Sequence, residues 1–226
     1  MRVYNARVAE IRLNREGRPA VWIECPGRAI PAPGRYTLAD AGESLLATPL
    51  FAAEIGSGGF LSAASIPGSW APGTLLQLRG PLGKGFNLPT DTQKLALIAL
   101  GETAARLLCL AAQAEGKGLA VALFGDLPTA ALPVAIEAHP LSALPEALFW
   151  ADFLALDLPL ADLPILREKL RLAPASSLRL LGQALVTAPM PCGGLADCGV
   201  CASPGRGEGQ LVCKSGPVFN LDKLEW

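Results

Sequence analysis

Four of the six cysteines of this 226-residue chain lie near its C-terminal end, in a glycine-rich stretch from Pro191 to Phe219. A chain of this length has enough apolar core to fold without covalent cross-links. The first residues are charged throughout and lack the apolar stretch of a secretory signal, so we expect a cytoplasmic protein with reduced thiols. In a reducing compartment a cysteine cluster is more often a metal or redox site than a disulfide framework.

The spacing of the four cysteines is Cys192-x5-Cys198-x2-Cys201-x11-Cys213. Structural zinc sites usually present two short Cys-x-x-Cys hooks, and here there is only one. The order instead matches the plant-ferredoxin spacing Cys-x4-Cys-x2-Cys with a distant fourth cysteine, apart from one extra residue in the first gap. Thiolates are soft ligands that hold iron and bridging sulfide well, so the spacing predicts a 2Fe-2S cluster. Structural zinc and free or disulfide-bonded thiols stay open as alternatives.

The residues between the cysteines fit this hypothesis. Gly193, Gly194 and Gly199 let the backbone adopt positive φ angles, so that amide N–H groups can point at the sulfur atoms and stabilise their negative charge. Asp197 stands where a four-residue gap would have placed the second ligand. Because Cys198 keeps the tighter spacing to the third cysteine, we interpret the extra residue as an enlarged turn and not as an aspartate ligand.

Charge and hydropathy exclude several classes of partner. The chain has 19 basic and 20 acidic side chains, which gives no electrostatic footprint for nucleic acid or an anionic membrane surface. Its most apolar region, ALFWADFLALDLPLADLPIL, is interrupted by three aspartates and two prolines, so it predicts no membrane span. The hydrophobic content of 51% indicates either a large core or a surface covered by a partner subunit.

The chain divides into three parts by its pattern. Residues 1–90 read as short strands separated by Gly and Pro turns, which predicts an antiparallel β-barrel. Residues 91–182 alternate buried strands, among them KLALIAL, LAVALFG, PVAIEA and DFLALDL, with helices at TAARLLCLAAQAEGKG, LSALPEAL and ILREKLRL. This alternation predicts a parallel sheet with crossover helices. Residues 183–226 form the cluster-binding segment.

Three further residues invite a functional interpretation but favour a simpler one. Cys25 and Cys109 lie in apolar segments, and free cysteine is among the most buried residue types, so we expect both to act as small hydrophobic side chains. His139 is the only histidine and precedes a proline, so it has no second histidine with which to share a metal. We expect it in a surface loop.

The tail resembles the electron-transfer subunit of type B dihydroorotate dehydrogenase, a branch of the ferredoxin-reductase-like flavoproteins. The residues that carry the resemblance are MPCGGLADCGVC and LVCKSGPVFNLDKL in the tail, GPLGKGF at Gly80 to Phe86, and PGRYTL at Pro33 to Leu38. The order of barrel, α/β layer and cysteine loop covers essentially the whole chain. The resemblance implies a flavin-binding-like barrel followed by a nucleotide-binding-like α/β domain.

The resemblance also implies a relay of electrons. In that family NADH gives a hydride to FAD, single electrons pass to a 2Fe-2S cluster, and a partner subunit that holds FMN exchanges them with dihydroorotate or orotate. Carried over to this chain, the cluster ligands would be Cys192, Cys198, Cys201 and Cys213. The expected assembly is a hetero-oligomer with a catalytic oxidoreductase subunit, and the expected process is pyrimidine biosynthesis.

The flavin motif of the family is altered in this chain. Where the family has an Arg-Arg-Pro-x-Ser-like order, the corresponding stretch here is Leu46-Ala47-Thr48-Pro49-Leu50-Phe51, which keeps the proline and has no positive charge. A pyrophosphate without its guanidinium partner loses a charge-assisted contact. We therefore expect weakened FAD binding, with Thr48 and Pro49 as the candidate contacts.

The dinucleotide loop is altered as well. The family has several glycines after the first α/β strand, whereas this chain reads Ala99-Leu100-Gly101-Glu102-Thr103 and keeps Gly101 alone as a candidate contact. Glu102 puts an anion near the helix N-terminus that would receive phosphates, and we interpret it as a first-turn residue favoured by the helix dipole. The Cys-Gly-Pro that the family has after a later strand is also missing. The sequence thus predicts weakened NAD binding.

Three functional hypotheses follow. In the first, the protein is an electron-transfer subunit that keeps its 2Fe-2S cluster and has weakened or lost its FAD and NADH sites. In the second, it is an ordinary FAD-containing, NADH-linked subunit whose flavin is held by other barrel residues. In the third, it is a non-redox scaffold whose cysteine loop is a structural zinc site.

Overall fold

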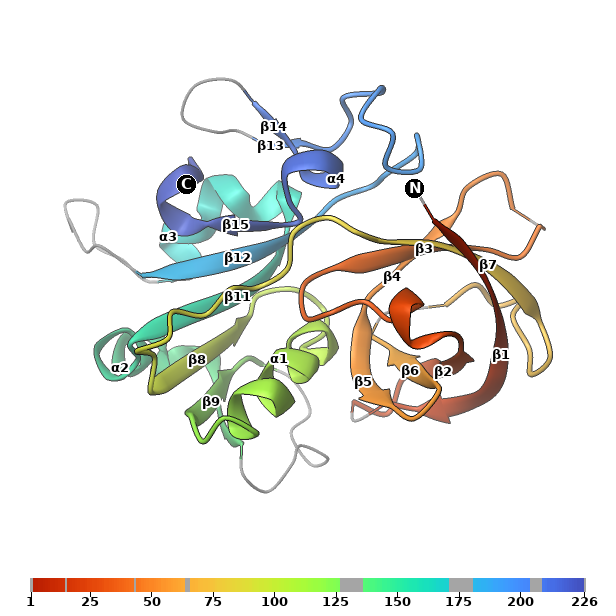
Figure 1. Cartoon of the computed structure of the whole chain (residues 1–226). Coiled ribbons are helices and arrows are strands. Elements are labelled where there is room, and N and C mark those ends of the chain that lie inside the picture. Colours follow the sequence, from red (N-terminus) through yellow and green to blue (C-terminus); the bar gives the residue numbers. More distant parts are fainter. Residues whose placement is uncertain are drawn as a thin grey trace.

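The computed structural model describes residues 2–14, 16–42, 44–63, 66–126, 136–170, 181–203 and 209–225. It consists of an antiparallel barrel followed by a layer with a mainly parallel sheet, and the C-terminal segment lies above the junction of the two (Figure 1). This order, with an antiparallel barrel first and a parallel-sheet layer second, is the one that the sequence predicts.

The barrel is a seven-stranded antiparallel sheet with the order β4-β3-β7-β1-β2-β6-β5. Its strands are β1 (Val3–Leu13), β2 (Pro19–Glu24), β3 (Tyr36–Asp40), β4 (Thr48–Leu50), β5 (Ala52–Gly56), β6 (Gly59–Ser62) and β7 (Leu75–Leu82), with a 3-10 turn at Gly27–Ala29. The two outer strands, β4 and β5, are consecutive in the chain and separated only by Phe51. The chain therefore passes directly from one end of the sheet to the other, as in a barrel.

The second layer is a six-stranded sheet with the order β10-β9-β8-β11-β12-β15. Its strands are β8 (Lys94–Ala99), β9 (Ala120–Phe124), β10 (Glu137–His139), β11 (Phe153–Pro159), β12 (Gly182–Thr187) and β15 (Val218–Asn220). All neighbours pair in parallel except β12 and β15, which are antiparallel. The predicted parallel sheet is therefore confirmed. Strands buried on both faces read as the continuous apolar runs seen in the sequence.

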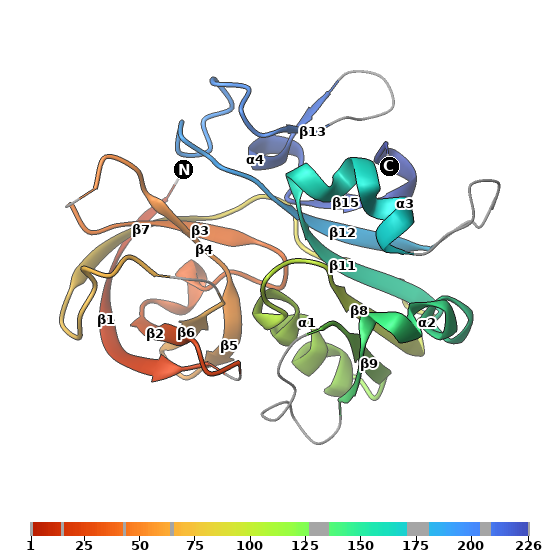
Figure 2. The ribbon, with the colours of Figure 1, turned by 180° about the vertical axis from the view of Figure 1, so that it is seen from behind.

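Helices cover both faces of this sheet (Figure 2). The helix α1 (Ala105–Glu115) packs its leucines on one face, between the sheet and the barrel. On the opposite face lie α2 (Leu144–Trp150), α3 (Leu166–Lys169) and the 3-10 segments Leu141–Ala143 and Leu160–Ile165. The C-terminal segment, which includes β13 (Ala202–Ser203), β14 (Gln210–Leu211), α4 (Val212–Ser215) and a 3-10 turn at Leu221–Lys223, packs on that same face.

Apolar side chains join the barrel to the second layer. Tyr36 and Phe51 of the barrel form a buried cluster with Ala105 of α1, Leu185 of β12 and Val218 of β15. The rings of Tyr36 and Phe51 lie 5.8 Å apart between centroids, at an interplanar angle of 42°. Because Tyr36 is completely buried, the two parts share one continuous apolar interface.

Two stretches that carried the sequence resemblance, GPLGKGF and CKSGPVF, meet in space. The amide of Lys84 donates to the carbonyl of Gly216 at 2.7 Å, and Lys84 also forms an isolated bridge with Pro217. Gly83 has φ 73°, and a Cβ atom there would collide with the Pro217 ring and with the Gly216 carbonyl. The linker between barrel and sheet therefore requires a glycine where it crosses the C-terminal segment.

The structure tests what the sequence led us to expect of Cys25, Cys109 and His139. Cys25 and Cys109 are both buried in the same apolar cluster of the barrel, and burial raises the pKa of each thiol to about 11, which confirms them as small hydrophobic residues. The expectation for His139 is wrong, because it ends β10 and stacks on Phe124 at 5.0 Å. Part of the predicted PVAIEA strand lies outside the described residues.

In the described part of the chain no helix is long and apolar enough to cross a membrane. Its apolar segments are accounted for by the sheet, where β8 and β11 are buried almost along their whole length.

The close approach at the linker gives a stability test. We predict that Gly83→Ala lowers the free energy of unfolding by about 2 to 4 kcal/mol, because it combines an unfavourable positive φ with overpacking. The matched control is Gly58→Ala, where φ is 78° and nothing lies within 4 Å of the added Cβ. Urea titration should show a smaller loss for the control. Equal losses would contradict the close packing of linker and tail.

Candidate metal-binding site of four cysteines

The four cysteines come from one loop and one short helix inserted between strands of the second sheet. Cys192, Cys198 and Cys201 lie between β12 and β13, and Cys213 lies in α4. The small hairpin of β13 and β14 connects them, since the amide of Val212 donates to the carbonyl of Cys201 at 2.9 Å. The antiparallel pairing thus brings the end of the loop beside the start of the helix.

Burial differs strongly within the set. Cys201 is 1% exposed and Cys213 is 5% exposed, and both belong to the apolar cluster that fills the α2 and α3 face of the sheet. Cys192 is half-buried and Cys198 is exposed. The set therefore extends from the core of the second layer to the molecular surface.

The thiols associate in two pairs. Cys198 makes a side-chain hydrogen bond with Cys192, and Cys201 makes one with Cys213. The pairs are near enough for the charge of Cys192 to act on Cys213. Among the described residues, however, no three or more His, Cys, Asp or Glu side chains form a group that could surround a single metal ion. The described thiols thus lie in two neighbouring pairs.

Backbone amides point at the sulfur atoms. The N–H groups of Asp197, Cys198 and Leu195 donate to Cys192, and these hydrogen bonds lower the pKa of its thiol from 9.0 to about 6. The backbone N–H of Ala196 donates to Cys213. These are short-range donors that stabilise a thiolate.

The loop conformation explains how those amides converge. Gly193, Gly194 and Gly199 have φ angles of 61°, 74° and 70°, as the sequence predicted, and Ala196 also has a positive φ of 68°. The donors themselves are the residues between the glycines. Asp197 contributes its backbone N–H to Cys192, which accords with an enlarged turn.

Cys213 behaves in the opposite way to Cys192. Burial, together with the hydrogen bond and charge of Cys201, raises the pKa of its thiol to about 11. Two adjacent buried thiolates repel each other without a counter-charge. In the cluster-free chain the Cys213 thiol therefore keeps its proton, whereas a bound cation would favour its release.

Two barrel residues that the sequence did not identify support the loop. The hydroxyl of Tyr36 donates to the carbonyl of Cys213 at 3.2 Å, and the guanidinium of Arg79 donates to the carbonyl of Gly193. Burial, together with the charges of Cys213 and Cys201, raises the pKa of Tyr36 to about 12. Only the register of β3 and β7 brings these side chains to the loop, so no local motif could have revealed them.

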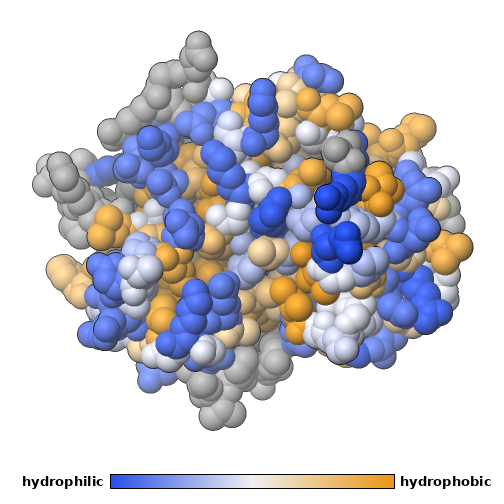
Figure 3. Space-filling model, viewed as in Figure 1, coloured by the Kyte–Doolittle hydropathy of each residue, from blue (hydrophilic) through white to orange (hydrophobic). Residues whose placement is uncertain are grey.

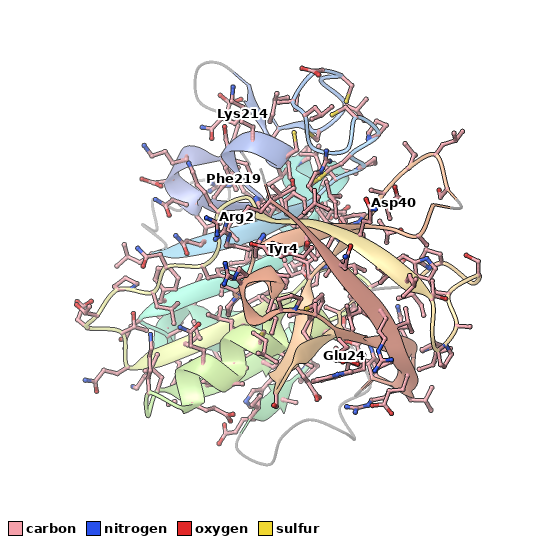
Figure 4. The ribbon with its side chains drawn as sticks, turned by 45° about the vertical axis from the view of Figure 1, so that its right-hand side comes forward. Arg2, Tyr4, Glu24, Asp40, Lys214 and Phe219 are labelled. Carbon is pink, nitrogen blue, oxygen red and sulfur yellow. The ribbon has the colours of Figure 1, made fainter. Side chains whose placement is uncertain are left out.

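A pocket of about 350 Å³ lies between the barrel and the cysteine loop. The sulfur atoms are drawn in yellow between the labelled Lys214 and Asp40 in Figure 4. The pocket is lined by Val3, Leu38, Asp40, Leu45, Leu46, Ala47, Gln77, Arg79, Pro191, Cys192 and Gly193. It therefore connects the start of the predicted flavin strand with the first cysteine, and Arg79 supplies a positive charge that the strand itself lacks.

The predicted flavin contacts lie on a short strand. Thr48 and Pro49 are half-buried in β4, and they pair with Ala39 and Leu38 of β3. The residue that follows this strand, Phe51, is 5% exposed and packed in the interface with the second layer. The two candidate contacts are thus near the pocket but are not among the residues that line it.

The predicted nucleotide contact lies after β8. A Cβ atom at Gly101 would stand 3.4 Å from a guanidinium nitrogen of Arg106, so the space beside this glycine is already occupied. The interpretation of Glu102 as a first-turn residue is wrong. Its side chain is 93% exposed, it lies 4.0 Å from Arg18, and α1 begins only at Ala105. The carboxylate at the start of this helix belongs to Glu16, which sequence reasoning missed.

No protein-family model matches the chain, and no curated protein matches its sequence. Solved structures do match its fold. The chain is similar to a chain of the NADH-dependent reduced ferredoxin-NADP oxidoreductase, a structure described for flavin-based electron bifurcation. The TM-score is 0.74 and the identity 17%, over 97% of this chain and 89% of that chain. It is also similar to the Amycolatopsis cytochrome P450 reductase, with a TM-score of 0.61 and 18% identity over 82% of this chain and 70% of that chain.

A third similar structure is phthalate dioxygenase reductase, described as a modular structure for electron transfer from pyridine nucleotides to [2Fe-2S]. It matches with a TM-score of 0.56 and 10% identity over 97% of this chain and 77% of that chain. At these identities the similarity shows a common fold. The chain therefore has the ferredoxin-reductase-like fold, with a barrel and a nucleotide-binding-like layer.

Proposed function

We propose that the protein is an electron-transfer subunit that carries a 2Fe-2S cluster on Cys192, Cys198, Cys201 and Cys213 and exchanges electrons with a partner oxidoreductase. When bound, a 2Fe-2S cluster supplies reversible one-electron transfer. The observation that carries the proposal is the association of the thiols in two pairs, Cys192 with Cys198 and Cys201 with Cys213.

The pairing favours two irons over one zinc ion. A 2Fe-2S cluster bound by four cysteines distributes them over two metal ions. A structural zinc site instead needs all four sulfur atoms around one centre, about 2.3 Å from it. The association of the thiols in two pairs supports the cluster over the zinc scaffold.

The amides of the loop would have a defined role toward a bound cluster. An iron-sulfur cluster with four thiolates carries net negative charge, and hydrogen bonds to its sulfur atoms help to set its reduction potential. The backbone N–H groups that now donate to Cys192 and Cys213 would stabilise that charge without adding a cationic side chain. The core packing of Cys201 would limit access of water from the inner side.

The outer side of the loop offers a route for electrons to a partner. Cys198 is exposed, and the apolar side chains Leu195 and Val200 beside it are 55% and 52% exposed. In Figure 3 hydrophobic and polar side chains alternate at the top of the molecule, where the C-terminal segment lies. Exposed apolar residues next to a redox group are suited to a heteromeric contact that excludes water.

The resemblance of the tail identifies the first partner to test. It points to an FMN-containing catalytic subunit like that of dihydroorotate dehydrogenase, and hence to pyrimidine biosynthesis. Because fold and function can separate, this finer assignment rests on the tail motifs.

A second candidate keeps a flavin in this chain. The pocket beside Cys192 is lined by Arg79, Gln77 and Asp40, whose polar groups could hydrogen-bond to the edge of a flavin ring. Such a ring would lie directly next to the first cluster ligand. Flavin released by heating the purified protein supports this candidate, whereas its absence from an iron-loaded preparation favours a chain that holds the cluster alone.

Cysteine variants test the ligand set. We predict that Cys198→Ser and Cys201→Ser each remove the visible absorption and the bound iron of anaerobically purified protein. Cys25→Ala, a buried cysteine of the barrel, serves as the control and should keep both. Because the Cys198 side chain is exposed, Cys198→Ser should not unfold the chain, so a loss of colour in this variant reports the loss of a ligand. Unchanged spectra in both serine variants would contradict the assignment.

The reactivity of Cys192 gives a test by pH. Its pKa is lowered to about 6 by amide hydrogen bonds, so the nucleophilic thiolate is present above that pH and is lost as the pH falls through it. We predict that alkylation of Cys192 in cluster-free protein has its midpoint near pH 6, whereas an ordinary thiol titrates at about 8.5. Peptide mass spectrometry after iodoacetamide pulses measures it. In iron-loaded protein Cys192 should be protected from iodoacetamide. Rapid alkylation of Cys192 in iron-loaded protein would exclude it as a ligand.

The apolar rim of the loop can be tested with charge. We predict that Leu195→Glu weakens binding of the subunit that co-purifies from the native host by at least about tenfold, because it buries a charge in the contact. Phe149→Glu on α2 is the control, since Phe149 is 86% exposed away from the cysteine loop. Pull-down titration measures both. Equal effects, or a chain that purifies alone, would contradict a contact at this rim.

A further inference from the structure

The start of α1 lies where a sheet of this kind binds nucleotides. In the strand order β10-β9-β8-β11-β12, the strands β9 and β10 are added on one side of β8, and β11 and β12 are added on its other side. The order of the strands therefore switches between β8 and β11. Doubly wound sheets bind dinucleotides at this switch point, with the phosphates at the N-terminus of the helix that follows the first strand. Here that helix is α1, which follows β8 and lies between the sheet and the barrel (Figures 1 and 2).

A carboxylate from the barrel already occupies this helix start. One oxygen of Glu16 accepts a hydrogen bond from the amide of Ala104 at 2.6 Å, and the other accepts one from the hydroxyl of Thr103 at 2.7 Å. The same Thr103 hydroxyl oxygen accepts a hydrogen bond from the amide of Ala105 at 3.0 Å. The carboxylate therefore makes contacts of the kind that a phosphate oxygen would make at this position.

The turn that carries Glu16 is held in place. Glu16 lies between β1 and β2, and its amide donates to the side-chain oxygen of Asn14 at 2.9 Å. The amide of Arg18 donates to the same oxygen at 2.9 Å. Since Asn14 thus fixes both sides of the turn, the half-buried Glu16 side chain is presented to α1 by a preformed loop of the barrel.

The interior of the crevice is also filled by the chain itself. Arg106 of α1 forms an ion pair with Asp157 of β11 at 2.8 Å, and the side chains are 11% and 0% exposed. Asp157 pairs with Ala99 of β8, so this ion pair lies at the switch point. The second carboxylate oxygen of Asp157 is buried and has no hydrogen-bond partner in the described structure.

The charges around the crevice disfavour a further anion. Glu16 and Asp157 are close enough to interact electrostatically, and the exposed Glu102 adds a third carboxylate at the rim. Against them stand Arg106, which is already paired, and Arg18, which faces Glu102. An incoming pyrophosphate would have to displace the Glu16 carboxylate from its hydrogen bonds and would meet uncompensated negative charge.

We propose that Glu16 is an internal substitute for a ligand phosphate, which closes the dinucleotide crevice of this fold and excludes nicotinamide nucleotides as direct electron donors. Glu16 is thus a specificity-determining residue, since the chain keeps the strand order and helix of a dinucleotide-binding sheet. This role of Glu16 in electron transfer rests on the function proposed above for the cysteine loop, whose electron exchange does not use a nicotinamide nucleotide bound here. The same contact ties the barrel to the second layer at the point where nucleotide would otherwise bind.

The test compares nucleotide binding in matched variants. NADH and inorganic pyrophosphate are titrated by calorimetry into the full chain, into Glu16→Ala and into Glu24→Ala, which removes an equal charge from an exposed ion pair with Arg7. We expect no saturable binding by the wild type or the control. Glu16→Ala should bind pyrophosphate saturably, with a Kd at least about tenfold below the highest concentration at which the wild type shows no binding, and it should bind NADH more weakly than pyrophosphate. Saturable NADH binding by the wild type, or no gain in Glu16→Ala, would overturn the proposal.

A second variant covers the case in which Glu16→Ala does not fold. Glu16→Gln keeps the length and one acceptor oxygen but removes the charge, so it should shift the amide resonance of Ala104 and raise pyrophosphate affinity. Unshifted resonances at Thr103 and Ala104 would show that Glu16 is not bonded there. Because neither readout uses iron, failure of the cluster assignment leaves this test unaffected, and the reverse also holds.

Discussion

The packing of Cys201 and Cys213 against the apolar face of the second sheet is the contact on which the candidate site depends. Both side chains belong to the same buried cluster as Val186 and Phe219, which lie on the two strands that flank the cysteine loop. The antiparallel pairing of β12 with β15 fixes the ends of this insertion. A long loop held at its base by a sheet and at its centre by buried thiols loses little further entropy when it binds a metal.

The barrel completes this arrangement from the other side. The completely buried Tyr36 reaches from β3 to the carbonyl of Cys213, and Arg79 reaches from β7 to Gly193. The linker that joins the two parts crosses beneath the tail at Lys84. Barrel, sheet and loop thus form a single packed unit, in which the cysteine end is anchored by three contacts and the nucleotide end is closed by Glu16. The chain has the same fold as these reductases. Its cysteine end has the ligands that a cluster would need, whereas its nucleotide end is occupied by Glu16.

Much of the fold could be predicted from the sequence because its signals are local. Runs such as KLALIAL and DFLALDL are long, apolar and bounded by turn residues, and they became β8 and β11 of a parallel sheet. The cysteine spacing likewise predicts that these four residues lie close together, and they associate in two pairs. The positive φ angles of the loop glycines are a conformation that glycine adopts without steric cost, so the residue type made them a reasonable expectation.

The remaining features depend on contacts that are distant in sequence. Glu16 and Ala104 are 88 residues apart, and Tyr36 and Cys213 are 177 residues apart, so no window of the chain contains either contact. The local pattern predicts Glu102 at the helix start because it is an acidic residue just before the helix, whereas α1 begins only at Ala105. The proline after His139 predicts a loop, whereas His139 stacks on Phe124 at the end of β10. In each case tertiary packing overrode the local signal.

The metal content of anaerobically prepared protein, measured together with acid-labile sulfide, tests the central claim most directly. The account predicts iron and sulfide in equal amounts, about two of each per chain, with an electron paramagnetic resonance signal that appears on one-electron reduction. A preparation that holds about one zinc ion per chain and no sulfide would contradict it, and so would one that holds no metal while its four thiols stay reactive.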